Sequence, residues 1–488
     1  MNPIYLSSRI RESFEQHRND VCLVAGSAIL KYRDVWEKIL EKAEFFWKCG
    51  IREGDVLTLS YKSNALDLIY SILSTLCIGA KCCIIPPPHQ QGHIDNNLLG
   101  QWFLTEGPFH ADHLRLAASS GQYFLYGMAN YRKLPKEFDK TWLILPTSGT
   151  TGCPKWIFLS ESGVMETVAS IQAYMNTGPE DVFFALKHLG HISSITSDLL
   201  LSLLSGGKLI VNMSDFKLRS LAAQIKNNRV TVLTLVPTIL NYLIKENIRN
   251  NMESVRAISL VGAPAPRSLL IEANHCLPQT EIFIGYGLTE ASSRVTYLPP
   301  KQFIEKIGSI GKPIDGITVK LFRNNEEITT AHTIGEIAVR GPGVMVGYWD
   351  GTDYVVHQDE FLPTNDLAYF DNEGFYYHRG RKDDVMIING VNVSAIELEE
   401  KITQLDAVEA CVVFKDGSAR DFDKITALIE LKPGTVVNEK EIYIKMQAVL
   451  PISLMPKIIK IIDKIPVESN GKISRRVLQN HFGIYGDA

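Results

Sequence analysis

The chain of 488 residues is 45% hydrophobic and 21% charged, which is typical of a globular protein with more than one hydrophobic core. Its 50 basic and 54 acidic residues give a formal net charge of -4, so charge provides no basis for binding nucleic acid or an anionic membrane. The eight cysteines form no CxxC pair, and no apolar run reaches the roughly 20 residues of a membrane helix. Because the N-terminus also lacks the apolar core of a secretory signal, we expect a cytoplasmic protein without membrane insertion.

Helix and strand patterns alternate in the first half of the chain. Apolar residues recur at helical spacing in 32–47 and 65–77. Strand-like apolar runs occupy 56–59, 81–85, 230–235 and 257–261. Cys82 and Cys83 fall inside one of these runs and are expected to be small buried hydrophobic residues. This alternation predicts βαβ units, in which helices cover the faces of a parallel sheet.

The sequence pattern changes in the second half of the chain. From residue 310 onward short strand-like segments alternate with Gly-rich turns, as in 335–349, which predicts a small β-rich subdomain. From residue 393 to the end, two helix-like and two strand-like segments predict a compact α+β unit. We therefore predict an α/β fold with a large N-terminal domain, 1–382, of α/β subdomains plus a β-rich subdomain, followed by a small α+β C-terminal domain, 383–488.

One segment, 142–160, has the composition of a polyphosphate-binding loop. An apolar strand leads into Thr147, Ser148, Gly149, Thr150, Thr151 and Gly152, and Lys155 follows. Glycines let backbone N–H groups approach phosphate oxygens, hydroxyls add donors, and a lysine offsets charge. By composition alone the loop could also be a flexible turn. A Walker A loop is disfavoured, because Lys155 follows a proline and precedes Trp156.

The loop closely resembles the phosphate-binding signature of the adenylate-forming superfamily, which includes acyl- and aryl-CoA synthetases, nonribosomal-peptide adenylation domains and luciferases. Further signatures of that superfamily follow in its fixed order: IGYGLTEAS at 284–292, GEIAVRGPGVMVGYW at 335–349, PTNDLAYFDNEGFYYHRGRKDD at 363–384 and IPVESNGKISRRVL at 465–478. The resemblance covers nearly the whole chain, and chance agreement at all of these segments is improbable.

The resemblance implies a role for each matching residue. Tyr286 would stack on adenine, Thr289 would contact phosphate, Glu290 would hold Mg²⁺, and Asp366 would accept both ribose hydroxyls. Alone, each segment has a plainer interpretation, such as a turn, a capped helix or a solvated surface side chain. The nucleotide-binding set implied in this way, besides the phosphate loop, is Gly262, Ala263, Tyr286, Gly287, Asp366 and Arg381. The implied catalytic set is Lys472, Glu290, Thr289 and Lys155.

In the superfamily two reactions share one site. A carboxylate first attacks the α-phosphorus of ATP, with Mg²⁺ and lysines such as Lys472 offsetting the charge. The C-terminal domain is then expected to rotate about a hinge at Asp383, which makes it a mobile domain, and a thiol attacks the acyl adenylate. The expected co-substrate is coenzyme A or the phosphopantetheine arm of a carrier protein, with a slight preference for coenzyme A.

Three residues depart from the superfamily pattern. Trp156 stands where a Gly is common, Asn365 replaces the Gly of a TGD motif, and Ile387 replaces a frequent Lys. None of the three changes removes a charged residue with an implied catalytic role. The change at Ile387 concerns the thiol step more than adenylation.

The acyl pocket is expected around 183–207, with His191, Ser193, Val261 and Gly285 among its lining residues. Ser193 stands where amino-acid adenylation domains carry an Asp for the substrate ammonium, so an α-amino acid is disfavoured. Asp198 could serve a differently placed amine, although a helix-surface aspartate is the expected interpretation. We expect a fatty, aryl or other non-α-amino acid, with amino-acid adenylation, a luciferase-like oxygenase and a non-catalytic nucleotide-binding regulator as alternatives.

Overall fold

The computed structural model describes most of the chain. The described residues are 6–62, 66–85, 100–109, 114–129, 131, 133–147, 155–212, 218–245, 251–358, 360–388, 391–415, 425–466, 478 and 482. Within them, no helix combines the length and apolar character that crossing a membrane requires.

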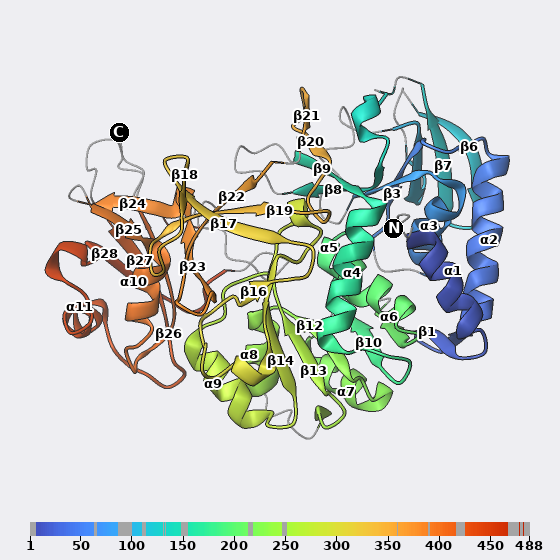
Figure 1. Ribbon diagram of the computed structural model, residues 1–488. Helices are drawn as coiled ribbons and strands as arrows, with labels where there is room; N and C mark the ends of the chain where they lie inside the picture. The colour runs from blue at the N-terminus through green and yellow to red at the C-terminus, as the bar shows by residue number, and fades with distance from the viewer. Residues whose placement is uncertain are drawn as a thin grey trace.

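Two large sheets form the centre of the molecule (Figure 1). Nine strands of the described chain make the first sheet, in the order β16-β15-β14-β13-β12-β10-β11-β1-β2. Its five central neighbours from β14 to β11 pair in parallel, as the βαβ pattern predicts. The bounds are β1 (Val21–Ala25), β2 (Ala28–Lys31), β10 (Val182–Ala185), β11 (Lys208–Val211), β12 (Val232–Leu235), β13 (Ala257–Leu260), β14 (Glu281–Tyr286), β15 (Thr296–Leu298) and β16 (Lys312–Pro313).

The second large sheet has the order β21-β20-β9-β8-β4-β3-β5-β7-β6 among the described residues. Cys82 and Cys83 are fully buried in its strand β4, as predicted. The bounds are β3 (Val56–Ser60), β4 (Lys81–Ile85), β5 (Trp102–Glu106), β6 (Leu114–Ser120), β7 (Tyr123–Met128), β8 (Thr141–Thr147), β9 (Lys155–Ser160), β20 (Gly347–Trp349) and β21 (Tyr354–Val356).

Helices fill the space between the sheets and cover the outer face of the first. In Figure 1, α4 runs from β9 of the second sheet toward β10 of the first. It begins where the Ser160 hydroxyl accepts a hydrogen bond from the N–H of Gly163 and ends at Asn176 in the left-handed conformation. The bounds are α1 (Leu6–Gln16), α2 (Tyr32–Lys48), α3 (Leu66–Ile78), α4 (Glu161–Met175), α5 (Ile192–Ser194), α6 (Leu201–Leu204), α7 (Leu218–Asn228), α8 (Pro237–Lys245) and α9 (Arg267–Cys276).

A smaller five-stranded sheet of order β18-β17-β19-β22-β23 follows along the described chain. In Figure 1 it lies between the two large sheets and the C-terminal elements. It corresponds to the predicted β-rich subdomain. The bounds are β17 (Thr318–Arg323), β18 (Glu326–Ile328), β19 (Gly335–Arg340), β22 (Leu362–Phe370) and β23 (Tyr376–Arg381).

The last part of the described chain builds a core of its own from residues between Met386 and Met455. Helix α10 packs on an antiparallel pair, β26 and β27, and β28 adds in parallel. The α+β composition predicted from residue 393 onward is confirmed, although β28 was not anticipated. The bounds are β24 (Val385–Ile388), β25 (Val391–Ser394), α10 (Ala395–Ile402), β26 (Val408–Lys415), β27 (Ile425–Leu431), α11 (Glu439–Met446) and β28 (Ile458–Ile462).

Candidate active site

The predicted nucleotide residues Tyr286 and Asp366 meet although 80 positions separate them in the chain. Tyr286 is the last residue of β14, and its hydroxyl donates a 2.7 Å hydrogen bond to Asp366 Oδ2. Asp366 lies in β22 of the small sheet, so this bond connects the first large sheet to the β-rich subdomain. The contact lies at the carboxyl end of parallel strands, where α/β sheets commonly bind ligands.

Two further side chains complete this arrangement, which we call the ribose cluster: Tyr286, Asp366, His378 and Arg381. His378 Nε2 lies 3.4 Å and Arg381 Nε 4.0 Å from Asp366 Oδ1. Burial raises the pKa of Asp366, but His378, the Tyr286 hydroxyl and Arg381 outweigh it and hold the pKa below its ordinary value. The carboxylate is therefore ionised at neutral pH, which allows it to accept hydrogen bonds from two hydroxyl groups. Sequence reasoning missed His378, which β22–β23 pairing brings opposite Ala368.

The departure at Asn365 has a structural explanation. Its backbone has φ 63°, a left-handed conformation that Gly adopts freely and Asn tolerates better than most other residues. Its N–H donates to Glu336 Oε1 at 3.1 Å, and its side-chain amide donates to the carboxylate of Asp383. The predicted hinge residue Asp383, which is exposed, is therefore hydrogen-bonded directly to the residue that precedes Asp366.

The turn after β14 is compact around Gly287. A Cβ at this position would stand 1.9 Å from the carbonyl oxygen of Ser293, so only glycine fits. Thr289 and Glu290, both half-buried, form a short 3₁₀ turn (Thr289–Ala291), and the Glu290 carbonyl accepts a 2.9 Å bond from the N–H of Met345. This bond places the turn beside the segment that leads into β20.

Glu290 is the carboxylate that would hold Mg²⁺. Among the described residues no group of three or more His, Cys, Asp or Glu side chains could bind a metal by itself. A single carboxylate nevertheless suits Mg²⁺, which usually takes one or two protein carboxylates and completes its shell with substrate phosphates and water. The donor set is consistent with a metal that arrives with ATP.

Thr147 and Lys155 flank the predicted phosphate loop at the ends of the paired strands β8 and β9, where they face each other in the register. The Lys155 ammonium lies 4.4 Å from the centre of the Tyr348 ring. The remaining loop residues Ser148, Gly149, Thr150, Thr151 and Gly152, like Lys472 near the C-terminus, lie outside the described residues.

Trp156, the second departure, is a core residue. It is 4% exposed and packs with Phe138, Phe158 and Trp349 in a hydrophobic cluster between β9 and β20. Its large side chain therefore supports the strand that carries Lys155 from the side opposite the site. The third departure, Ile387, belongs to β24, but its side chain lies outside what the structure describes.

The residues expected to line the acyl pocket come from two regions. His191 and Ser193 are half-buried at the start of α5. Val261 is buried just beyond β13, half-buried Ala263 and exposed Gly262 follow it, and half-buried Gly285 is the residue before Tyr286. The Ser193 hydroxyl accepts a 2.8 Å bond from the ammonium of Lys187. A cation therefore stands at the position where an α-amino acid would require an anion.

The prediction for Asp198 was wrong. Instead of facing solvent, it is 2% exposed, because it lies in a π-helical stretch (Ile195–Leu200) in which every residue is buried. Burial raises the pKa of Asp198 to about 7, against the lowering effects of Lys187, a hydrogen bond from Thr234 and Arg294. Within the part of the chain that the structure describes, its Oδ2 has no hydrogen-bond partner. The helical spacing of its neighbours did not reveal that both faces of this segment are covered.

Sequence reasoning also missed Arg294, whose side chain is fully buried. Its Nη2 donates to Ser197 Oγ at 3.3 Å and to Ser259 Oγ at 3.2 Å. A Cβ at Gly285 would stand 1.7 Å from Nη1 of Arg294, so the guanidinium occupies the space that the glycine leaves. The only signal in the sequence was a charged residue eight positions after Tyr286, which is too weak to interpret.

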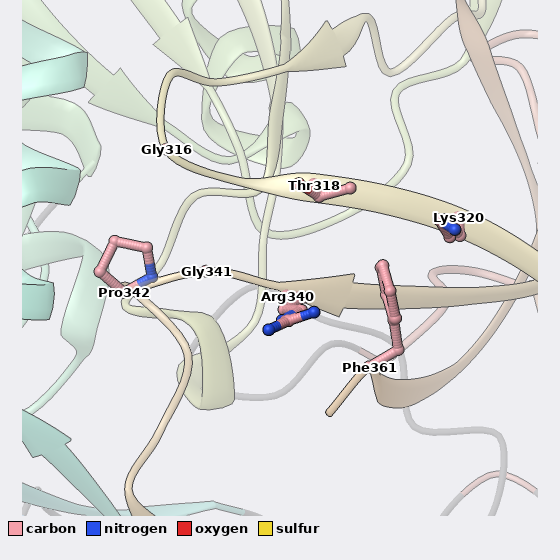
Figure 2. A pocket seen from close by; sticks show the side chains of 7 residues that line it. All are labelled: Gly316, Thr318, Lys320, Arg340, Gly341, Pro342 and Phe361. Carbon is pink, nitrogen blue, oxygen red and sulfur yellow. The ribbon is translucent and has the colours of Figure 1, made fainter. Parts of the chain in front are cut away.

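A separate hollow of about 620 Å³ opens beside β17 and β19 (Figure 2). Gly316, Thr318, Lys320, Arg340, Gly341, Pro342 and Phe361 line it. None of these residues belongs to the predicted site, and Lys320 already forms a 2.6 Å ion pair with Glu327. Arg340, Gly341 and Pro342 belong to the 335–349 motif, but the hollow contains none of the residues predicted to bind the nucleotide or the acid.

Comparison with known proteins places this site in a family. The family model for AMP-binding enzymes matches residues 105–349, half of the chain. The chain is 26% identical over 473 residues to the 2-succinylbenzoate–CoA ligase of Oceanobacillus iheyensis (93% of this chain, 94% of the relative). It is 28% identical over 476 residues to the feruloyl-CoA synthase of an Amycolatopsis species (94% and 95%).

Solved structures show the same fold. The o-succinylbenzoate CoA synthetase of Bacillus subtilis, in complex with its acyl-adenylate intermediate, matches with a TM-score of 0.78 at 22% identity, covering 96% of this chain and 97% of that one. ATP-bound MatB from Rhodopseudomonas palustris matches with a TM-score of 0.82 at 20% identity and 99% coverage of both chains. The predicted fold class is confirmed, and the chain belongs to the AMP-binding enzymes of the adenylate-forming superfamily.

Proposed function

We propose that the chain is an ATP-dependent, AMP-forming ligase that adenylates a carboxylic acid and transfers the acyl group to the thiol of coenzyme A. The observation that carries the proposal is the ribose cluster, in which Asp366 is kept ionised by His378, Tyr286 and Arg381 at the end of β14. A half-buried carboxylate with remaining acceptor capacity suits two neighbouring hydroxyls.

In the proposed first step, an oxygen of the acid attacks the α-phosphorus of ATP, the bond to the β-phosphate oxygen breaks, and pyrophosphate leaves. Asp366 holds the ribose, while Tyr286, Gly287 and the Gly262–Ala263 segment surround the base. Thr147 and Lys155 flank the phosphate loop, and Thr289 faces the phosphates from the opposite turn. Mg²⁺, when bound, would offset the charge of the phosphate oxygens. Lys472 would do the same at the attacking carboxylate.

The second step is attack of the thiolate on the acyl carbon of the adenylate, with AMP as the leaving group. We propose that domain 383–488 rotates relative to domain 1–382 about Asp383 between the two steps. The hydrogen bond from Asn365 to Asp383 supports this, because it connects the hinge to the residue beside Asp366. Coenzyme A is favoured over a carrier protein, since the relatives named above are CoA ligases.

The acid in this proposal is a fatty, aryl or other non-α-amino acid. Ser193 binds the Lys187 ammonium at 2.8 Å, and an α-ammonium group placed there would meet a like charge in a largely buried setting. The relatives act on aryl acids according to their names, 2-succinylbenzoate and ferulate, which supports an aryl acid as the first class to test.

Acid-dependent exchange between ATP and pyrophosphate tests the first step without assuming any thiol. A panel of aryl, fatty, hydroxy and amino acids is measured with the wild type and Lys472→Ala. Lys464→Ala, which removes an exposed lysine nearby, is the matched control. We expect exchange with one class of acid, lost in Lys472→Ala and retained in Lys464→Ala. Absence of exchange with every acid, while ATP still binds, would overturn the catalytic proposal.

The thiol is tested separately. Once an active acid is known, thioester formation is compared between coenzyme A and a phosphopantetheine-loaded carrier protein. Faster product formation with coenzyme A supports the proposal. If only the carrier protein accepts the acyl group, adenylation stands and the choice of thiol is wrong.

A further inference from the structure

The buried guanidinium of Arg294 plays no part in the steps described so far. We call Arg294 and the groups around it, Ser197, Ser259 and Gly285, the arginine cluster. Side chains from the π-helical stretch, β13 and β14 meet there. A charged group that is carried into the interior needs a counter-charge or a full set of hydrogen bonds, because desolvation is otherwise costly.

The hydrogen bonding of Arg294 is incomplete. Nη2 has two hydroxyl partners, Ser197 and Ser259, at 3.3 and 3.2 Å, both of which are neutral. Nε and Nη1 have no hydrogen-bond partner among the described residues. Structural arginines in cores normally have their donors satisfied. Each unpartnered nitrogen belongs to a buried cation, and a charged carboxylate oxygen is the strongest acceptor that a substrate could offer to such an N–H group.

The charges nearby do not balance Arg294. Asp198 is close enough to interact electrostatically with Arg294. Burial raises the pKa of Asp198 to about 7, so this carboxyl is partly protonated at neutral pH. Asp198 therefore offsets the charge of Arg294 only in part, and a bound anion would complete the neutralisation.

The turn that precedes Arg294 has an uncommon backbone conformation. Ser292 and Ser293 both lie in the left-handed region, with φ 49° and 82°, and such strain is often found at functional sites. The Ser292 hydroxyl donates to the Gly343 carbonyl at 2.7 Å, and the hydroxyls of Ser293 and Thr196 are 2.6 Å apart. Arg294 therefore enters the interior from a turn that is fixed on both sides.

The arginine cluster lies next to the ribose cluster. The N–H of Val295, the residue after Arg294, donates to the carbonyl of Tyr286 at 2.8 Å. Gly285, which lies against Nη1 of Arg294, is adjacent to Tyr286 and only half-buried. The guanidinium therefore lies against one of the residues that the sequence predicts to line the acyl pocket.

We propose that Arg294 binds a second carboxylate of the acid, so that the substrate is a dicarboxylic acid with one carboxylate adenylated and the other held by the guanidinium. This inference rests on the proposed adenylation function and specifies its substrate class. A monocarboxylic acid of the same skeleton would leave the guanidinium without its anion. The discrimination then follows from an unpaired buried charge and not from the size of the pocket.

Matched pairs of acids test the inference, because each pair differs only in the second carboxylate. The pairs are 2-succinylbenzoate with 4-oxo-4-phenylbutanoate, phthalate with benzoate, and adipate with hexanoate. Pyrophosphate exchange is measured for the wild type, Arg294→Met and Arg294→Lys. Since a hydrogen bond to a charged group is worth a factor of about 10 to 100, we expect a diacid to exceed its monoacid by at least about tenfold. Arg294→Met should remove this preference, and Arg294→Lys should retain part of it.

Arg256→Met is the matched control. Arg256 is also a partly buried arginine, but it pairs with Asp181 at 2.6 Å at the start of β10, far along the strand from the predicted site. Its loss should lower stability without changing the ratio between diacid and monoacid. ATP binding and circular dichroism establish that each variant is folded. The ratio between diacid and monoacid exchange rates in the wild type tests the inference even if a variant does not fold.

Equal rates within every active pair, preference for monoacids, or a diacid preference that survives in Arg294→Met would each overturn the inference while leaving adenylation intact. If no acid supports exchange, the proposed function fails by its own test. In that case the thermal midpoint of unfolding in the presence of each diacid still decides the binding question. A rise with a diacid, absent in Arg294→Met, supports the carboxylate site, and no rise with any diacid overturns it.

Discussion

The ribose cluster and the arginine cluster lie on either side of Tyr286 and differ in how well their charges are satisfied. In the ribose cluster, Asp366 has a hydroxyl, an imidazole and a guanidinium within 4.0 Å. In the arginine cluster, Arg294 has two neutral hydroxyls and two unpaired nitrogens. The first is organised without its ligand, and the second is not.

This difference has a physical interpretation. A site that binds the nucleotide of every reaction benefits from being preorganised, because the ordering cost is met during folding. A site that selects one acid among many benefits from a charge that only the correct acid can neutralise, since the wrong acid then leaves that charge unpaired. The two clusters illustrate both strategies a few residues apart.

The largest effect is expected from the ribose cluster. Asp366→Ala removes the acceptor of two ribose hydroxyls, so we expect kcat/KM for ATP in pyrophosphate exchange to fall about 100-fold or more. Asp371→Asn is the control, because Asp371 accepts bonds within the β22–β23 turn and from Lys306 and Tyr377, outside the ribose cluster. Similar ATP kinetics for the two variants would contradict the assigned role of Asp366.

The second prediction concerns the pH dependence of the arginine cluster. The pKa of Asp198, raised to about 7 by burial, means that the folded protein retains a proton that the unfolded chain loses near pH 4. This contribution to stability is present at low pH and is lost as the pH rises through about 7.

Asp198→Asn keeps the side chain neutral at every pH. We expect the free energy of unfolding of the variant relative to that of the wild type to increase by about 1 to 3 kcal/mol between pH 5 and pH 8. Thermal midpoints at the two pH values measure this. Arg294→Met should steepen the loss in the wild-type background, because it removes a cation that favours the carboxylate. Parallel pH profiles for wild type and Asp198→Asn would refute the prediction.

A smaller effect is expected from a substitution that disturbs the arginine cluster and leaves the ribose cluster intact. Gly285→Ala would place a methyl group 1.7 Å from Nη1 of Arg294 and 3.0 Å from Val261 Cγ1, so the guanidinium must move. We expect the KM for the acid to rise about tenfold while the KM for ATP changes little. Gly178→Ala, at a glycine with nothing near its missing Cβ, should leave both constants unchanged. Equal effects on acid and ATP would show that the clusters are not independent.

The smallest effect is expected at Asn365, which replaces the Gly of the superfamily's TGD motif. Asn365→Ala places a less tolerant residue at φ 63°, which should cost about 1 kcal/mol of stability. Asn365→Gly relieves the backbone but loses the bond to Asp383, so adenylation should be retained while thioester formation changes. Chemical denaturation and the two half-reactions, measured separately, test this. Unchanged thioester formation in Asn365→Gly would argue against a role for that bond at the hinge.

The sequence was sufficient to predict much of the local structure, and it yields a prediction for the nucleotide residues. Periodicity located α2 and β4 closely, because their apolar faces are long and uninterrupted. The motif around Tyr286 and the one around Asp366 were assigned to one site from their order along the chain. The 2.7 Å bond between these side chains is consistent with that assignment.

The buried charges could not be predicted in this way. Asp198 reads as a surface residue in a helical pattern, and Arg294 reads as an ordinary charged residue after a turn. Both are interior only because the π-helical stretch lies between packed elements and because Gly285 lacks a side chain. Periodicity reports which face of an element is apolar, whereas the burial of a polar residue depends on what packs against the opposite face.

By itself, the sequence determined the α/β fold class and the family and predicted the nucleotide-binding residues, because backbone propensities and short motifs act over a few neighbouring positions. Only the tertiary structure decided that His378 lies beside Asp366 and that Arg294 enters the interior next to Gly285. These contacts join residues whose separation in the chain carries no local signal, and their energies depend on desolvation, which exists only once the elements have packed.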